Sequence, residues 1–137
     1  MTKRIGVGII VICKGKVLLL RRATKPEYGM WAVPGGLMED GELPETTARR
    51  ELKEETGLEA NVLIEVLPRR LAPNDPGIEA TVFYIMESGI DNVKLSDEHT
   101  GYIWVSPRDL PSNISPLTIL KIGDASKNDQ LSSICLA

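Results

Sequence analysis

The chain has 137 residues, a formal net charge of −3, and 42% hydrophobic and 26% charged residues. This length and composition suit one globular domain with its own core, so we expect a single domain over 1–137 with a loose tail from about 124. The slight acidic balance argues against nucleic acid as a partner, and no apolar stretch approaches the length of a membrane span. Two distant cysteines, Cys13 and Cys135, make no disulfide framework, so we expect a reducing, cytoplasmic setting.

The N-terminal third predicts strands. Two β-branched and Leu-rich runs, 5–13 and 16–22, are separated by Lys14-Gly15 and predict a hairpin. After a polar loop, 31–33 forms a short apolar piece, and Pro34-Gly35-Gly36 predicts a turn that ends it.

One strong helix is predicted from Leu43 to Thr56, with Pro44 in its first turn and Gly57 as its C-terminal cap. Beyond it, the sequence predicts strands at 61–67, 78–86 and 102–105, and a short final helix opened by Ser115-Pro116. Strands on both sides of one strong helix indicate an α/β domain with a mixed sheet.

Three glutamates of the predicted helix lie close together around its axis. At 100° per residue, Glu51, Glu54 and Glu55 share an arc of about 100°, which adjoins the apolar stripe. Like charges at this spacing repel one another, and the cost rises if the arc is partly buried. Mg²⁺ would relieve this repulsion, because it prefers carboxylate oxygens and commonly bridges to substrate phosphates. Read alone, Glu54-Glu55 is more often a solvated face.

The wider spacing changes that interpretation. Residues 36–58 carry a glycine, a glutamate, an Arg-Glu pair, a Glu-Glu pair and a second glycine at fixed intervals: Gly36, Glu42, Arg50, Glu51, Glu54, Glu55 and Gly57. Leu52 and Leu58 fill the two aliphatic places. This pattern resembles the Nudix signature without departures, and Trp31 and Pro34-Gly35-Gly36 before the helix also resemble the family.

The resemblance implies a Nudix-type α/β/α sandwich with a mixed β-sheet and the hydrolysis of a nucleoside diphosphate linked to another group. It implies that Gly36, through its carbonyl, and Glu51, Glu54 and Glu55 bind Mg²⁺, or Mn²⁺ in its place. Arg50 would orient the carboxylates through charge-assisted hydrogen bonds, with Glu42 in the same network.

For the general base the resemblance leaves two candidates. Glu54 is the first choice, and Glu98 is the rival, either as base or as a further metal ligand. We interpret His99, the only histidine, as a polar loop residue or a structural contact. A homodimer is expected only because dimers are frequent in the family.

The signature does not choose the substrate. Arg21 and Arg22 are candidates for phosphate binding, and either is equally well a strand-end surface charge. Trp31 and Tyr102, along with Phe83 and Tyr84, are candidates for stacking on a base, although aromatic residues in strands more often belong to the core.

We expect a nucleoside or deoxynucleoside triphosphate, cleaved to monophosphate and pyrophosphate. The alternatives are ADP-ribose, for which Pro73 is a weak mark, and a dinucleoside polyphosphate. Two alternatives belong to other functional classes. A non-catalytic nucleotide sensor would lack some of the glutamates of the signature. An isoprenoid diphosphate isomerase would need a reactive cysteine, for which Cys13 is a poor candidate.

Overall fold

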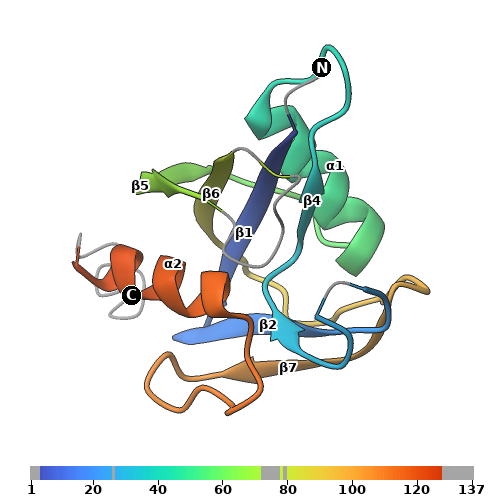
Figure 1. Cartoon of the computed structure of the whole chain (residues 1–137). Helices are drawn as coiled ribbons and strands as arrows, with labels where there is room; N and C mark the ends of the chain where they lie inside the picture. Colours follow the sequence, from blue (N-terminus) through green and yellow to red (C-terminus); the bar gives the residue numbers. More distant parts are fainter. Residues whose placement is uncertain (1–3, 26, 72–77, 79, 128–137) are drawn as a thin grey trace.

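The computed structural model describes residues 4–25, 27–71, 78 and 80–127. Within them it contains strands β1 (Ile5–Cys13), β2 (Lys16–Arg22), β3 (Trp31–Ala32), β4 (Gly35–Leu37), β5 (Ile64–Arg70), β6 (Ala80–Glu87) and β7 (His99–Val105), and helices α1 (Pro44–Thr56) and α2 (Pro116–Lys127). The predicted hairpin is confirmed, because β1 and β2 pair antiparallel on either side of residues 14 and 15 (Figure 1).

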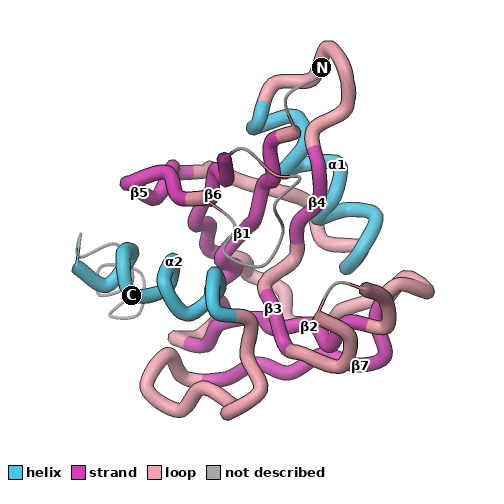
Figure 2. The backbone as a smooth tube through the Cα atoms, viewed as in Figure 1, coloured by secondary structure: helices cyan, strands magenta, loops and turns pink. Residues whose placement is uncertain are grey.

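The sheet is mixed, as predicted. Its main path runs β3-β2-β1-β6-β5, with β4 also pairing with β1 and β7 with β2. β1 and β6 pair parallel from Ile5 to Ile12, whereas the other strand pairs are antiparallel. A parallel neighbour requires a crossover, and the chain between β1 and β6 includes α1. Figure 2 shows the strands at the centre, with α1 and α2 on different sides of them.

The prediction of a turn at Pro34-Gly35-Gly36 is wrong. Gly35–Leu37 is strand β4, which pairs antiparallel with Gly6, Val7 and Gly8 of β1. A side chain at Gly35 would place its Cβ 2.1 Å from the Val7 carbonyl oxygen. The glycine therefore permits a close approach of two strands, a use of glycine that composition alone does not distinguish from a turn.

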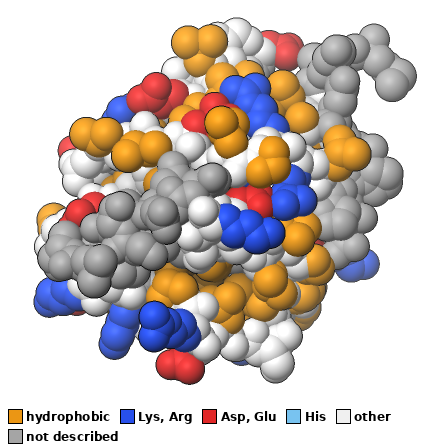
Figure 3. Space-filling view, turned by 90° about the vertical axis from the view of Figure 1, so that its left-hand side faces the viewer, with side chains coloured by type: hydrophobic (Ala, Val, Ile, Leu, Met, Phe, Trp, Pro, Cys, Tyr) orange, Lys and Arg blue, Asp and Glu red, His pale blue; other side chains and the backbone are white. Residues whose placement is uncertain are grey.

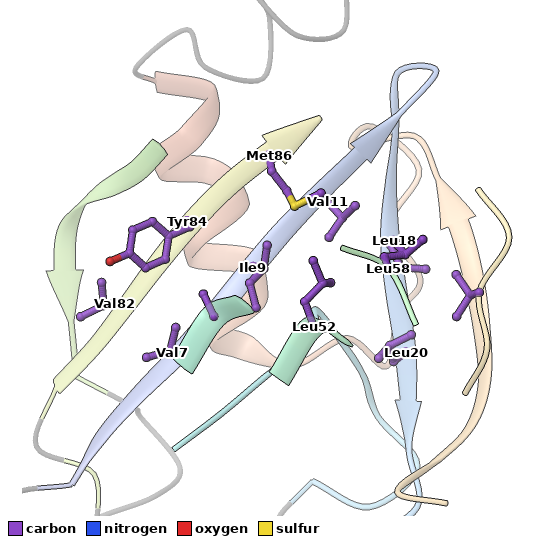
Figure 4. Close-up of a cluster of buried hydrophobic side chains, with 12 residues drawn as sticks. Val7, Ile9, Val11, Leu18, Leu20, Leu52, Leu58, Val82, Tyr84 and Met86 are labelled. Carbon is purple, nitrogen blue, oxygen red and sulfur yellow. The ribbon is translucent and has the colours of Figure 1, made fainter. Parts of the chain in front are cut away.

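Two apolar clusters occupy the two faces of the sheet. The first joins Leu52 of α1 to Ile9, Leu20 and Met86 of the strands (Figure 4). The second joins Ile122 of α2 to further strand residues on the other face. The alternation of side chains along β1 supplies both clusters, because successive residues point to opposite faces. The expected sandwich with a mixed sheet is thus confirmed.

Helix α1 begins and ends as its sequence predicts. Leu43 is extended and lies just before the helix, and Pro44 occupies the first helical position. Gly57 closes the helix with φ of 74°, and its N–H donates to the Lys53 carbonyl at 2.9 Å. The rotation of α1 is set by Ala48 and Leu52, which pack into the first apolar cluster, and this decides which face its glutamates occupy.

The second half of the chain differs from prediction mainly in its boundaries. The strand predicted at 61–67 is β5, shifted to 64–70, and α2 continues to Lys127, past the predicted start of a loose tail. Residues 128–137 and Pro73 lie outside the described residues. No helix within the described ranges is long and apolar enough to cross a membrane.

β5 and α2 lie side by side on the left of Figure 1, and that side faces the viewer in Figure 3. The described part of this surface mixes hydrophobic, basic and acidic side chains.

Candidate functional site

Arg50 is the centre of a hydrogen-bonded network at the start of α1. Its Nε and Nη2 donate to the two carboxylate oxygens of Glu42 at 2.7 and 2.9 Å, and its Nη1 donates to Glu51 Oε1 at 2.8 Å and to Glu54 Oε2 at 3.4 Å. Nη2 also reaches the Leu37 carbonyl at 3.3 Å. One planar guanidinium thus ties the loop before α1 to the glutamates on it, a geometry that lysine cannot reproduce.

Glu42 is held as a carboxylate by this network. The Arg50 guanidinium, the Glu39 N–H and the Thr47 hydroxyl all donate to it, and they lower its pKa to about 2. The same carboxylate raises the pKa of Arg50 above its ordinary value. Glu42 therefore orients Arg50 in the charged form at every physiological pH.

The three glutamates differ sharply in burial. The side chain of Glu54 is 58% exposed, that of Glu51 is 14% exposed and that of Glu55 is 3% exposed. The arc predicted from helical spacing therefore crosses the boundary between solvent and core. Glu54 faces solvent, whereas Glu55 lies beneath the sheet edge formed by β4.

Glu55 is the most perturbed group of the site. Burial, together with a hydrogen bond and charge repulsion from Glu51, raises its pKa to about 9, and the charge of Glu98 adds to the effect. Only the Gly35 N–H, which donates to Glu55 Oε1 at 3.3 Å, acts in the opposite direction. Two carboxyl groups that share one buried space cannot both ionise without a compensating positive charge.

The donor set fits a hard divalent cation. Among the residues that the structure describes, no group of three or more His, Cys, Asp or Glu side chains is arranged to hold a metal ion on its own. Mg²⁺ does not need one, because it keeps several waters and binds through one or two carboxylates and substrate phosphates. Glu51 lies against bare backbone at Gly36, where an added Cβ would come within 2.4 Å of the Glu51 carboxyl carbon. Crowded carboxylates beside open backbone form the kind of site that Mg²⁺ occupies.

His99 lies inside this site rather than on a polar loop. It opens β7, its side chain is 7% exposed, and its Nε2 is 3.7 Å from Glu55 Oε1. Burial, followed by the nearby charge of Arg22, lowers its pKa. The imidazole is therefore neutral at pH 7. Glu98, the residue before it, is exposed, and its carbonyl accepts the Ala23 N–H at 2.9 Å.

A cavity of about 360 Å³ lies beside β4, and the glutamates of α1 are not among its lining residues. Gly35, Gly36 and Leu37 of β4 line it on one side, and these residues also contact α1. Its wall combines an aromatic ring, small residues and cations: Phe83, Gly6, Gly8, Leu117, Thr118, Arg4, Arg22 and Lys25 are among its lining residues. The volume lies at the low end of the range of roughly 300–1,000 Å³ for small-molecule sites.

The aromatic wall depends on a glycine. A Cβ at Gly8 would lie 2.6 Å from two carbons of the Phe83 ring, so the ring rests on bare β1 backbone. Lys121 of α2 lies 5.6 Å from the ring centroid and is itself fully buried. Phe83 is thus packed against β1 and held near α2, with part of it in the cavity wall.

The structure brings together most, but not all, of the sequence-predicted residues. Gly36, Arg50, Glu51, Glu54 and Glu55 form one network with Glu42. The charge of Glu98 acts on Glu55. Of the substrate candidates, Arg22 lines the cavity, whereas Arg21, Trp31 and Tyr102 are not among its lining residues.

The remaining candidates have other surroundings. Trp31 packs against the second apolar cluster, Tyr102 is 38% exposed on β7, and Tyr84 belongs to the first cluster. Cys13 is buried at the end of β1, away from the cavity lining, which gives no support to the isomerase alternative.

Several cavity residues carried no usable sequence signal. Arg4, Lys25 and Thr118 come from three distant segments that only the fold brings together. The Gly6-x-Gly8 spacing within a strand was the one available hint, because glycine in a strand often marks a close approach of backbone or ligand.

The model of the NUDIX domain matches residues 2–122. A MutT-like protein of Streptomyces ambofaciens is 33% identical over 118 residues, which are 86% of this chain and 73% of that protein. The nucleoside triphosphatase NudI of Escherichia coli is 33% identical over 93 residues, 60% of this chain and 65% of NudI.

Solved structures share the fold. The NUDIX domain of Shewanella oneidensis NrtR, in a cocrystal with ADP ribose, superposes with a TM-score of 0.79 at 20% identity, covering 93% of this chain and 89% of that one.

Proposed function

The chain belongs to the NUDIX domain family, and from this we propose that it is a Mg²⁺-dependent pyrophosphohydrolase that cleaves nucleoside or deoxynucleoside triphosphates to monophosphate and pyrophosphate. The observation that carries the proposal is the contact between the two halves of the site. β4 lines the cavity and also contacts the helix whose acidic arc holds Glu51, Glu54 and Glu55.

Glu51 and Glu55 are the proposed carboxylate ligands of the metal ion, with Glu54 and the Gly36 carbonyl as further ligands. When bound there, Mg²⁺ would supply positive charge to the diphosphate and Lewis acidity to the attacking water. Mn²⁺ has the same preference for oxygen ligands and would substitute for it.

The protein's own residues have separate tasks in this proposal. Glu54 accepts the proton of the water that attacks phosphorus, because it is the exposed carboxylate of the arc and Arg50 holds it at 3.4 Å. As water adds to one of the two phosphorus atoms joined by the α,β-bridging oxygen, the bond from that phosphorus to the bridging oxygen breaks, and the products are monophosphate and pyrophosphate. Glu98 is the second candidate for the base, since it is also exposed and close enough to affect Glu55.

The cavity accounts for the remainder of a nucleotide. The base would lie against the apolar part of the cavity wall, to which the buried ring of Phe83 contributes, and Arg4, Arg22 and Lys25 supply cations for phosphates. The cavity volume of about 360 Å³ lies within the range of small-molecule sites and agrees with a nucleoside triphosphate as substrate. The similarity to NudI, named a nucleoside triphosphatase, supports the same choice.

ADP-ribose is the second candidate substrate, because the similar NrtR domain was crystallised with ADP ribose. A dinucleoside polyphosphate and a non-catalytic sensor remain alternatives. The homodimer and the cytoplasmic setting stay predictions from the sequence, as does the single domain over 1–137.

A substrate panel tests the proposal. The protein would be incubated with nucleoside triphosphates, ADP-ribose, dinucleoside polyphosphates and nucleotide sugars, each with Mg²⁺ and with EDTA, and the products identified by chromatography. We expect Mg²⁺-dependent release of pyrophosphate from at least one triphosphate. Binding of a nucleotide without turnover of any compound would favour the sensor instead.

The assignment of the base is tested by Glu54→Gln. We expect turnover to fall by at least about 10²-fold with the melting temperature unchanged, because the side chain is exposed. Glu45→Gln is the matched control, since Glu45 is an exposed glutamate of the same helix that pairs with an arginine, Arg49. Near-normal turnover of Glu54→Gln would transfer the role of base to Glu98.

A further inference from the structure

His99 is fixed beside the buried glutamate by the backbone of two strands. β7 pairs with β2, and a bulge between Arg21 and Arg22 brings Arg22 opposite His99. Immediately before His99, the Glu98 carbonyl accepts the Ala23 N–H at 2.9 Å. The start of β7 is therefore held at both residues, and the imidazole is directed inward to within 3.7 Å of Glu55.

Packing alone does not explain an imidazole at this position. The Nδ1 atom of His99 and the hydroxyl of Ser96 are buried, and neither has a hydrogen-bond partner among the described residues. Both belong to one turn, in which the His99 N–H donates to the Ser96 carbonyl at 3.4 Å. A buried polar atom without a partner costs free energy, which an apolar side chain of similar shape would avoid. We therefore expect the role of His99 to depend on its other ring nitrogen, Nε2.

That nitrogen faces one particular oxygen of Glu55. The Gly35 N–H donates to Oε1 at 3.3 Å, and His99 Nε2 lies 3.7 Å from the same oxygen. Two donors from opposite strands, β4 and β7, thus address Oε1. The Glu55 carboxyl also interacts with the Glu51 side chain.

We propose that His99 is a positioning residue for Glu55: its Nε2–H holds Oε1, so that Oε2 stays turned toward Glu51 and the metal ion. The inference rests on the function proposed above, in which Glu55 is a metal ligand. Imidazole–carboxylate pairs orient ligands in many metal sites. A separation of 3.7 Å is longer than a hydrogen bond, and a shift of a few tenths of an ångström closes it, as often happens when a site binds its ligand.

Three substitutions separate this role from packing. His99→Phe keeps the ring and its burial but removes both nitrogens. His99→Gln places an amide nitrogen near the position of Nε2, whereas His99→Asn places one near Nδ1. Thr100→Val, at the exposed neighbour on β7, is the matched control for a general disturbance of the strand.

The main measurement is the affinity for Mn²⁺, determined by titration calorimetry without substrate. The melting temperature in EDTA and the separate values of kcat and KM are measured for the same variants. We expect His99→Phe and His99→Asn to bind Mn²⁺ about 10- to 100-fold more weakly than wild type, the usual loss when a partner of a metal ligand is removed. His99→Gln should recover most of the affinity. At saturating metal, kcat should fall in the same order while KM for the nucleotide stays constant.

The outcomes are distinguishable. Wild-type affinity in His99→Phe would overturn the inference and leave the metal site itself intact. Equal losses in His99→Gln and His99→Asn, parallel to their melting temperatures, would show a structural role instead and would also overturn it. Absence of Mn²⁺ binding in the wild-type protein would refute the proposed metal site and the inference together.

Discussion

Replacing Glu55 by glutamine should make the metal-free protein more stable at alkaline pH, although it removes a residue of the site. In the unfolded chain Glu55 loses its proton near its ordinary pKa of 4.5, whereas in the folded protein it keeps the proton up to about pH 9. Between these values the folded state binds the extra proton, so its stability falls as pH rises. The contribution is complete below pH 4.5 and is lost through pH 9.

The magnitude follows from the pKa shift. Each pH unit in this window costs about 1.4 kcal/mol of unfolding free energy, so raising the pH from 7.0 to 8.5 costs about 2 kcal/mol. For a domain of this size that is roughly 5–10 °C in melting temperature. Glu55→Gln carries no charge at this position, and its stability should lack this loss.

The assay is thermal unfolding in EDTA at several pH values for the wild type and Glu55→Gln. The difference between the two curves isolates Glu55, because the other titrating groups are common to both. Excess Mg²⁺ should reverse the order at pH 8.5, stabilising the wild type and not the variant. Parallel curves in EDTA would refute the conclusion that Glu55 is a buried carboxyl crowded by Glu51.

Three further substitutions test other parts of the site. Arg50→Lys keeps the positive charge but loses the paired hydrogen bonds to Glu42, so kcat should fall about 10- to 100-fold in steady-state assays. An unchanged kcat would show that Arg50 does not orient the carboxylates. Gly8→Ala forces a Cβ against the Phe83 ring, so KM should rise by a larger factor than kcat falls. The free energy of unfolding, measured with denaturant, should decrease by about 1–3 kcal/mol. An unchanged KM would show that the substrate binds outside this cavity. Lys121→Met leaves the Val66 and Pro68 carbonyls without their buried hydrogen-bond donor. The free energy of unfolding should therefore decrease by about 2–4 kcal/mol. A stability equal to that of the wild type would mean that water molecules donate to these carbonyls instead.

The glutamate arc and the ends of helix α1 could be predicted from the sequence, because they depend only on residues that are close together in the chain. Helical spacing places Glu51, Glu54 and Glu55 on one arc, and Pro44 and Gly57 fix where the helix begins and ends. Spacing gives the direction of a side chain but not its depth. That Glu55 is buried and Glu54 exposed depends on β4, which covers one edge of the arc.

The cavity and His99 were not predictable, because both depend on contacts between distant segments. Phe83 enters the cavity wall only because β6 pairs parallel with β1 and Gly8 leaves room for the ring. His99 follows a polar run, Ser96-Asp97-Glu98, that is typical of an exposed loop. Its inward orientation comes from pairing with β2 across a bulge, which no pattern within 96–99 indicates.

In the proposed reaction, carboxylates on α1 direct water to a phosphorus atom of a nucleotide held beside β4. ³¹P NMR of a reaction with a nucleoside triphosphate and Mg²⁺, run in ¹⁸O-labelled water, tests it most directly. We expect nucleoside monophosphate and pyrophosphate as the first products, with the label in one of these two, and no reaction in EDTA. Release of inorganic phosphate and nucleoside diphosphate, or equal turnover in EDTA, would contradict it.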